Sequence, residues 1–191
     1  MEIKLLDKPI LYNYFRSSTS VRVRIALNLK GIDYEYKALH LRKGEHQTKE
    51  YLKINPYGLL PAIEFPSRMI LNQSLAILEY LDEIYPTPSI IPVNALERAK
   101  VRSMAYGIAL EIHPLNNLHV LNYLKEDLAL DELGIKNWFS KWVHKAFMPF
   151  ENILQNDKHT GIYCFGDTPT LVDIRLFAQV VNNVRFEVDM I

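Results

Sequence analysis

The sequence contains little cysteine, no net charge and no long apolar run. Its one cysteine among 191 residues, Cys164, cannot form an internal disulfide, which fits a reducing compartment. The 22 basic residues balance the 22 acidic ones, so the charge favours neither nucleic acid nor an anionic membrane as a partner. No stretch approaches membrane-spanning length, and the N-terminal M-E-I-K-L-L-D-K lacks the apolar core of a secretory signal. We therefore expect a cytoplasmic protein with no membrane or nucleic-acid partner.

Signatures of metal and nucleotide sites are also absent from the sequence. The six histidines include no pair at the i, i+4 spacing of a helical metal site, so we expect no metal. Neither G-x-G-x-x-G nor a Walker-type loop is present, and we expect no nucleotide cofactor. Cys164 lies in the apolar stretch G-I-Y-C-F-G-D, which favours a buried structural thiol over a reactive one.

The first half of the chain alternates between strand-like and helix-like segments. Val21, Ile25 and Leu29 recur every four residues after Ser18, and Lys30-Gly31 supplies a helix stop, which together predict a helix. The whole predicted order is strand, helix, strand, helix, strand, strand, helix. The other strands are expected at residues 9–14, 33–41, 59–65 and 68–71, and the other helices at 49–56 and 75–84.

A proline-rich segment separates this half from the rest of the chain. Residues 85–94 hold three prolines, which a helix interior or a central strand does not tolerate. We place a domain boundary in this segment, with one domain at residues 1–87 and a second at 88–191.

The second domain is expected to be all helical. One helix is predicted at residues 95–112, and another follows a long apolar stripe over residues 135–154. A third is predicted to begin at Thr170, because Asp173 three places on completes a capping-box pattern.

Four consecutive hydroxyl residues, Ser17 to Ser20, lie between the first predicted strand and the first predicted helix. Free backbone N–H groups and the positive end of the helix dipole meet at such a junction, so an anion fits there. Capping of the helix by Ser17 or Ser18 is the simpler interpretation, but it needs only one serine. A thiolate needs about 2.7 kcal/mol to dominate at neutral pH, which a helix N-terminus (~0.3–2 kcal/mol) and a hydroxyl donor (~1.5–3 kcal/mol) can supply together. Since no cysteine lies in this turn, the sulfur would come from a bound thiol ligand.

Two further stretches suggest a peptide-like ligand. Leu60 precedes Pro61 at the start of a strand, which predicts an extended Leu60 with its N–H and C=O free to pair with another extended chain. Gln73 and Ser74 open a helix, where N–H groups and the serine hydroxyl suit a carboxylate. A turn proline and a helix N-cap remain the alternatives for these two stretches.

Several segments resemble the zeta class of glutathione transferases, whose bacterial and animal members are maleylacetoacetate isomerases. Y-F-R-S-S-T-S-V-R-V-R is similar to the hallmark of that class, although Thr19 stands where the class has cysteine. N-P-Y-G-L-L-P-A, P-T-P-S-I-I-P, I-H-P-L-N-N-L-H-V-L, G-I-Y-C-F-G-D and R-F-E-V-D are similar to other zeta segments in the same order. The resemblance covers nearly the whole chain.

The resemblance implies a two-domain α+β fold, the glutathione transferase fold. A thioredoxin-like N-terminal domain with Pro61 in cis would precede an all-helical C-terminal domain, and two chains would pair as a homodimer. Glutathione would be the cofactor, with its sulfur near Ser18 and its γ-glutamyl carboxylate at Ser74. The residues implied to bind glutathione are Ser17, Ser18, His46, Leu60, Gln73 and Ser74.

The activity implied is isomerisation of maleylacetoacetate to fumarylacetoacetate in tyrosine and phenylalanine degradation. Thiolate would add to the cis double bond, the resulting single bond would rotate, and elimination would return glutathione unchanged. Cations would hold the two carboxylates and the developing enolate. The residues implied in catalysis are Arg16, Ser17, Ser18 and Thr19, with Ser18 as the main thiolate stabiliser. Those implied in substrate binding are Arg16, His113 and Arg185, whereas Arg22, Arg24 and Arg175 are interpreted as surface or interface charges.

The sequence departs from the class at three places. Thr19 keeps a hydroxyl in place of the thiol, and we expect activity to survive with a changed rate or substrate range. His46 replaces a glutamine near glutathione and can still donate a hydrogen bond. The chain stops at Ile191, where members of the class continue through a P-Y-P segment into a final helix. If Ile191 is the natural end, one wall of the substrate pocket is missing and isomerisation would be poor.

Other functions fit the same residues. A maleylpyruvate isomerase would use the same arginines, because both substrates are cis-ene diacids. A general glutathione-conjugating or haloacid-processing transferase is a second alternative. A glutathione-transferase-like binding protein without catalysis is a third, against which the retained Arg16, Ser17, Ser18, Gln73 and Ser74 argue.

Overall fold

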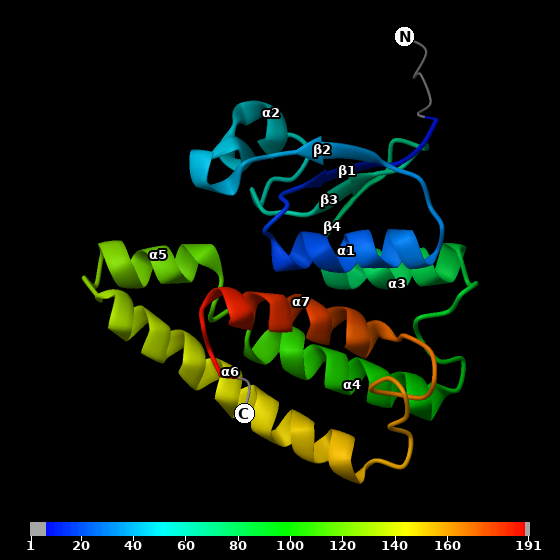
Figure 1. Ribbon diagram of the computed structural model, residues 1–191. Coiled ribbons are helices and arrows are strands. Elements are labelled where there is room, and N and C mark those ends of the chain that lie inside the picture. The colour runs from blue at the N-terminus through cyan, green and yellow to red at the C-terminus, as the bar shows by residue number, and fades with distance from the viewer. Residues whose placement is uncertain (1–6, 190–191) are drawn as a thin grey trace. The chain divides into compact units, whose positions relative to one another are not determined.

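The computed structural model describes residues 7–189 and divides into two compact units (Figure 1). We call Met1–Ser89 the N-terminal unit and Ile90–Ile191 the C-terminal unit. The division falls inside the proline-rich segment at residues 85–94. Within residues 7–189, no helix is long and apolar enough to cross a bilayer.

The N-terminal unit is built on a mixed four-stranded sheet in the order β2-β1-β3-β4. β1 runs parallel to β2 and antiparallel to β3, and β3 runs antiparallel to β4. This is the thioredoxin-like arrangement, and it confirms the predicted order of elements. The strands are β1 (Ile10–Asn13), β2 (Glu35–Ala38), β3 (Ala62–Glu64) and β4 (Ile70–Asn72), and the helices are α1 (Ser18–Leu29), α2 (Lys49–Leu52) and α3 (Ser74–Ile84).

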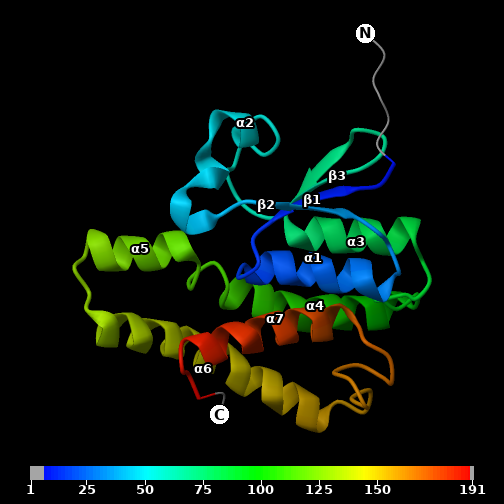
Figure 2. The same cartoon turned by 45° about the horizontal axis from the view of Figure 1, so that its top comes forward.

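The two faces of this sheet carry different packing. α1 and α3 pack against each other on one face of the sheet, as Figures 1 and 2 show. The strand residues Leu11 and Ile63, which are fully buried, point to that face. Their neighbours along the strands, Tyr12 and Ala62, join a second apolar cluster with Tyr51 of α2. Alternation along the strands therefore places α1 and α2 on opposite sides of the sheet.

The segment after β2 differs from the sequence prediction. A strand was expected over residues 33–41, but β2 ends at Ala38 and all four of its residues are exposed. Two short 3₁₀ helices follow it, η1 (Leu41–Lys43) and η2 (Glu45–Gln47), joined by Gly44 in the left-handed conformation. Such short turns have no hydrophobic period of their own, so the sequence pattern did not separate them from the strand.

The described part of the C-terminal unit is helical, as the sequence predicts. Its helices pack as α4 against α6 and α7, with α5 against α6. The separate helix α5 was not distinguished in the sequence, whereas the other three match the predicted positions. The helices are α4 (Ala95–Glu111), α5 (Leu118–Glu126), α6 (Glu132–Asn156) and α7 (Leu171–Arg185).

The predicted capping box at the start of α7 is confirmed. The Asp173 carboxylate accepts hydrogen bonds from the backbone N–H of Thr170 (2.7 Å) and from its hydroxyl (2.8 Å). The same carboxylate accepts a bond from the backbone N–H of Cys164 (2.9 Å). Cys164 is buried, and burial, reinforced by the neighbouring carboxylate, raises the pKa of its thiol. The expectation of a structural thiol is thereby confirmed.

Two arginines that were interpreted as surface or interface charges are buried within the chain itself, so that interpretation was wrong. Arg22 in α1 is 1% exposed and Arg175 in α7 is 0% exposed. The buried positions of α1 include the consecutive residues 20–23, so this helix is covered on more than one side. The guanidinium of Arg175 lies over the ring of Tyr106, 5.6 Å from its centroid.

We predict that Asp173→Ala lowers the free energy of unfolding by about 2 kcal/mol, because three hydrogen bonds and the cap are lost together. The matched control is Asp131→Ala, since Asp131 caps α6 through a single bond to the N–H of Gly134 (2.7 Å) and is exposed. That control should cost about 1 kcal/mol. Urea unfolding of both variants measures the difference, and equal losses would contradict the role assigned to Asp173.

Candidate functional site

The first turn of α1 begins at an N-cap serine. The Ser17 side chain accepts a hydrogen bond from the N–H of Ser20 (3.3 Å), and its own N–H donates to the carbonyl of Tyr14 (3.0 Å). The capping interpretation is thereby confirmed for Ser17. The N–H groups of Ser18 and Thr19 belong to the first turn, where a helix supplies no carbonyl partner and its dipole is positive. The geometry of this turn therefore suits an anion.

A chain of hydroxyls links this turn to the start of β3. The Thr19 hydroxyl donates to the carbonyl of Leu60 (2.8 Å) and lies 2.8 Å from the Ser17 hydroxyl. Because Thr19 has a single hydroxyl hydrogen, Ser17 is the donor to Thr19. Both hydrogens are thus engaged within the protein. Ser18, the candidate donor to a bound thiolate, lies in the same turn and is 5% exposed.

The turn between β1 and α1 carries Arg16, which is exposed. Arg24 holds this turn in place by donating to the carbonyl of Phe15 (3.1 Å) and to the side chain of Asn13 (3.2 Å). Arg24 is half-buried and also reaches the hydroxyl of Tyr36 (3.2 Å). The position of Arg16 next to the helix start is therefore fixed by contacts two turns further along α1.

Leu60 lies just before the cis peptide bond to Pro61, as the resemblance implies. Its carbonyl is not free, contrary to expectation, because Thr19 donates to it from 41 residues away, a contact that no local pattern reveals. A carbonyl has a second lone pair, which can accept a hydrogen bond from an extended ligand. The preceding carbonyl, of Leu59, accepts bonds from the Tyr51 hydroxyl (2.6 Å) and the Asn55 side chain (2.7 Å), which holds this segment in position.

The start of α3 holds the other predicted anion site. Gln73 is exposed and has φ of 65°, an uncommon conformation for a residue with a side chain. Ser74 is buried, and its hydroxyl accepts a hydrogen bond from Nη1 of Arg22 (3.5 Å). No acidic residue lies in the first turn of α3, so no side chain there repels a carboxylate from the helix dipole.

His46 lies in the 3₁₀ helix η2. Burial lowers the pKa of His46, so the imidazole is neutral at pH 7. Its Nδ1 is buried and has no hydrogen-bond partner in the part of the chain that the structure describes. The next residue, Gln47, donates to the carbonyl of Gly58 (3.0 Å), which ties this turn to the loop that leads into Leu60.

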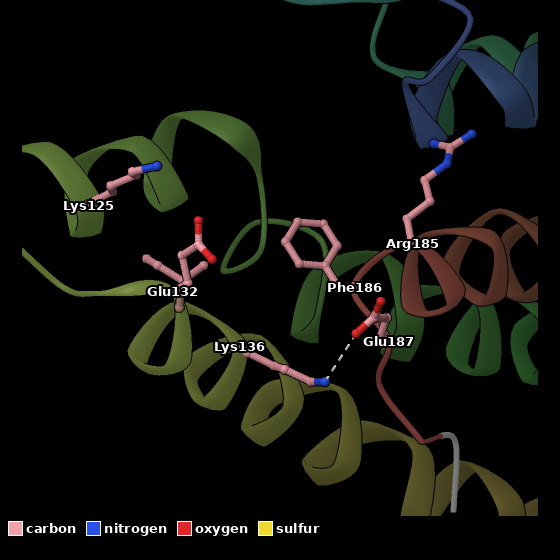
Figure 3. A pocket seen from close by; sticks show the side chains of 7 residues that line it. Lys125, Glu132, Lys136, Arg185, Phe186 and Glu187 are labelled. Atoms are coloured by element: carbon pink, nitrogen blue, oxygen red, sulfur yellow. Dashed lines mark ion pairs between the residues drawn. The ribbon is translucent and has the colours of Figure 1, made fainter.

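The C-terminal unit carries the other two predicted residues. Arg185, at the end of α7, lines a pocket of about 290 Å³. In Figure 3 its side chain points away from the ion pair between Lys136 and Glu187 (3.6 Å). His113 is half-buried, follows the end of α4 and is not among the residues that line this pocket. The lining consists of Lys125, Glu132, Ile135, Lys136, Arg185, Phe186 and Glu187.

The structure links some of the predicted site residues by hydrogen bonds, whereas His113 and Arg185 belong to the other unit. Ser17, Thr19 and Leu60 are linked directly in the N-terminal unit. The sequence analysis did not identify Arg22 as a candidate site residue. Its charge was the only available signal, and the apolar pattern of the helix did not reveal that its position is buried. Over residues 7–189, no group of three or more histidine, cysteine, aspartate or glutamate side chains could hold a metal ion.

Comparison with known proteins identifies relatives over almost the whole chain. A family model for the N-terminal domain of glutathione S-transferase matches residues 16–84. A maleylpyruvate isomerase from Ralstonia is 45% identical over 94% of this chain and 84% of its own length. A probable maleylacetoacetate isomerase from Vibrio cholerae is 45% identical over 95% of this chain and 84% of its own length.

Solved structures agree with these matches. A bacterial maleylpyruvate isomerase of the zeta class superposes with a TM-score of 0.92 at 45% identity, covering 95% of this chain and 85% of that one. A maleylacetoacetate isomerase from Methylobacterium extorquens, solved with malonate and glutathione, has a TM-score of 0.90 at 35% identity, covering 94% of this chain and 84% of that one.

We predict that Thr19→Val lowers the free energy of unfolding by about 1 kcal/mol, because the valine has the same shape but cannot bond to the Leu60 carbonyl. Urea unfolding measures the loss. Thr19→Ser, which keeps the hydroxyl, is the control and should remain closer to the original protein. A valine variant as stable as the serine variant would show that this bond does not hold the segment.

Proposed function

Because the chain belongs to the zeta class of the glutathione transferases, we propose that it is a glutathione-dependent isomerase that converts maleylacetoacetate to fumarylacetoacetate. One observation supports this most strongly. α1 forms hydrogen bonds to two of the other candidate glutathione-binding residues in the N-terminal unit, from Thr19 to Leu60 and from Arg22 to Ser74. Sites suited to a thiolate, an extended peptide and a carboxylate are thereby gathered around a single helix.

These three sites fit the parts of glutathione in order. The cysteinyl backbone would pair with extended Leu60, and its sulfur would then reach the first turn of α1, because the Thr19 hydroxyl is 2.8 Å from the Leu60 carbonyl. The γ-glutamyl carboxylate would bind at the start of α3, with Gln73 and Ser74. His46 would donate to the remaining part of the tripeptide through an imidazole N–H.

The first turn of α1 would hold the sulfur as an anion. The N-terminal dipole contributes ~0.3–2 kcal/mol and a hydroxyl that donates to a charged acceptor contributes ~1.5–3 kcal/mol. Together they cover the roughly 2.7 kcal/mol needed to lower a thiol pKa by two units. Ser18 is assigned the hydroxyl bond to the sulfur, because it is the first residue of α1, where the helix dipole is positive.

Bound glutathione supplies a thiolate that adds reversibly to the cis double bond, so that the resulting single bond can rotate before the thiolate leaves. The chain's own residues bind and orient the diacid. Arg16, exposed beside the start of α1, is assigned to one carboxylate and to the charge that develops on the neighbouring carbonyl oxygen. Arg185 is assigned to the second carboxylate, with His113 as a further polar contact. The malonate in the relative from Methylobacterium is itself a diacid, which supports this class of substrate.

Maleylpyruvate is a second candidate substrate, since a maleylpyruvate isomerase is 45% identical over 94% of the chain. Turnover of each acid with glutathione present, followed by the loss of enone absorbance, distinguishes them. We expect the higher kcat/KM with maleylacetoacetate, and a reversed order would identify maleylpyruvate as the substrate. Binding of glutathione without turnover of either acid would support a non-catalytic binding protein instead.

We also propose a cellular compartment, an oligomeric state and a metabolic pathway for the protein. The single cysteine, buried and unpaired, supports a reducing compartment such as the cytoplasm. Membership of the class supports a homodimer and a role in tyrosine and phenylalanine degradation.

We predict that Ser18→Ala raises the pKa of the bound thiol by about one to two units, because one hydrogen bond to the thiolate is lost. The acidic limb of the profile of kcat/KM against pH should shift upward by that amount, with lower turnover at pH 7. Ser20→Ala is the matched control, since its buried hydroxyl faces the N–H of Tyr14 (3.4 Å) instead. A profile that shifts equally in both variants, or in neither, would exclude Ser18 as the thiolate donor.

A further inference from the structure

Arg22 is one of the largest fully buried side chains of the protein and has few partners. It is 1% exposed, and its Nη1 donates a hydrogen bond to the Ser74 hydroxyl (3.5 Å). Its Nε and Nη2 are buried without a hydrogen-bond partner among residues 7–189. Burial lowers the pKa of Arg22 to about 10, which still leaves the guanidinium charged at neutral pH.

A buried charge in such surroundings is unfavourable by itself. Removing a guanidinium from water costs several kcal/mol unless a counter-ion and hydrogen bonds replace the water. The ion pairs seen in the described part of the chain do not include Arg22. The structure therefore holds a buried positive charge whose negative partner is not a residue among those described.

The nearest feature suited to an anion is the start of α3, an eleven-residue helix. The Ser74 hydroxyl accepts from Arg22, so its own hydrogen remains to donate to a ligand. The N–H groups of the first turn of α3 add further donors, and no acidic residue lies in that turn. The hydrogen bond from Arg22 thus orients the Ser74 hydroxyl so that its hydrogen can be donated to a ligand.

We propose that Arg22 is a positioning residue that orients the Ser74 hydroxyl and supplies the positive charge for the γ-glutamyl carboxylate of bound glutathione. This inference rests on the proposed function, because it requires glutathione at the start of α3. It adds that the affinity for this carboxylate comes partly from a charge on α1, the helix whose first turn is assigned to the thiolate. The alternative is that Arg22 only joins α1 to α3, which pack against each other.

The experiment compares glutathione with its analogue 4-aminobutanoyl-cysteinylglycine, which lacks only the γ-glutamyl carboxylate, by titration calorimetry. Arg22→Gln should weaken the binding of glutathione about tenfold and change the binding of the analogue less than twofold. At saturating glutathione, kcat should change less than twofold, because the carboxylate is remote from the reacting double bond. Arg22→Lys keeps the charge and should restore most of the glutathione affinity.

Arg22→Met serves as a second uncharged variant. An apolar side chain of similar length in place of a buried charge is often neutral or stabilising, so it should fold even if the glutamine variant does not. Arg24→Gln is the matched control on the same helix, since Arg24 binds Asn13 and the Phe15 carbonyl instead. This variant should keep the preference for glutathione over the analogue.

The outcomes separate this inference from the proposed function. Equal weakening of both ligands by Arg22→Gln or Arg22→Met would mean that Arg22 is only structural and would overturn the inference. The same conclusion follows if the unchanged protein binds both ligands equally well. If the unchanged protein does not bind glutathione at all, the proposed function fails, and the inference fails with it.

Discussion

The hydrogen bond from the Thr19 hydroxyl to the Leu60 carbonyl joins two segments that are 41 residues apart in the sequence. One is the first turn of α1, which suits an anion, and the other is the extended residue before β3, which suits a peptide. Leu60 also packs in the apolar cluster around Tyr12 and Tyr51, so the bond connects the helix start to a buried face of the sheet. This contact sets the spacing between the first turn of α1 and the extended residue before β3.

The same bond explains what a threonine at position 19 contributes in place of a cysteine. A threonine hydroxyl donates a strong hydrogen bond, whereas a thiol donates a weak one. With threonine, the hydroxyl hydrogens of Ser17 and Thr19 are both used within the protein, in bonds to Thr19 and to the Leu60 carbonyl. Thr19 therefore contributes to the architecture of the turn.

Local patterns predicted much of the fold. The helix Ser18–Leu29 followed from a four-residue apolar period and a Lys-Gly stop, and the start of α7 followed from the Thr170–Asp173 capping box. These features depend on residues within one or two turns. Local patterns also singled out Ser17, Ser18, Leu60, Gln73 and Ser74, whereas His46 and glutathione as the ligand came from the resemblance to the zeta class.

What the sequence did not show depends on distant contacts. The burial of Arg22 and its bond to Ser74 arise from the packing of α1 against α3, 52 residues apart, and a charged residue in a helix gives no sign of it. The engagement of the Leu60 carbonyl has the same origin. The 3₁₀ turns after β2 were missed for a local reason, since three-residue turns have no period to detect.

The proposed function requires that the start of α1 holds the sulfur of glutathione as an anion. A spectroscopic titration of thiolate absorbance in the binary complex with glutathione measures this. The bound thiol should titrate about two units below the free thiol, whose pKa is roughly 8.5. A bound thiol that titrates with the same midpoint as free glutathione would contradict it.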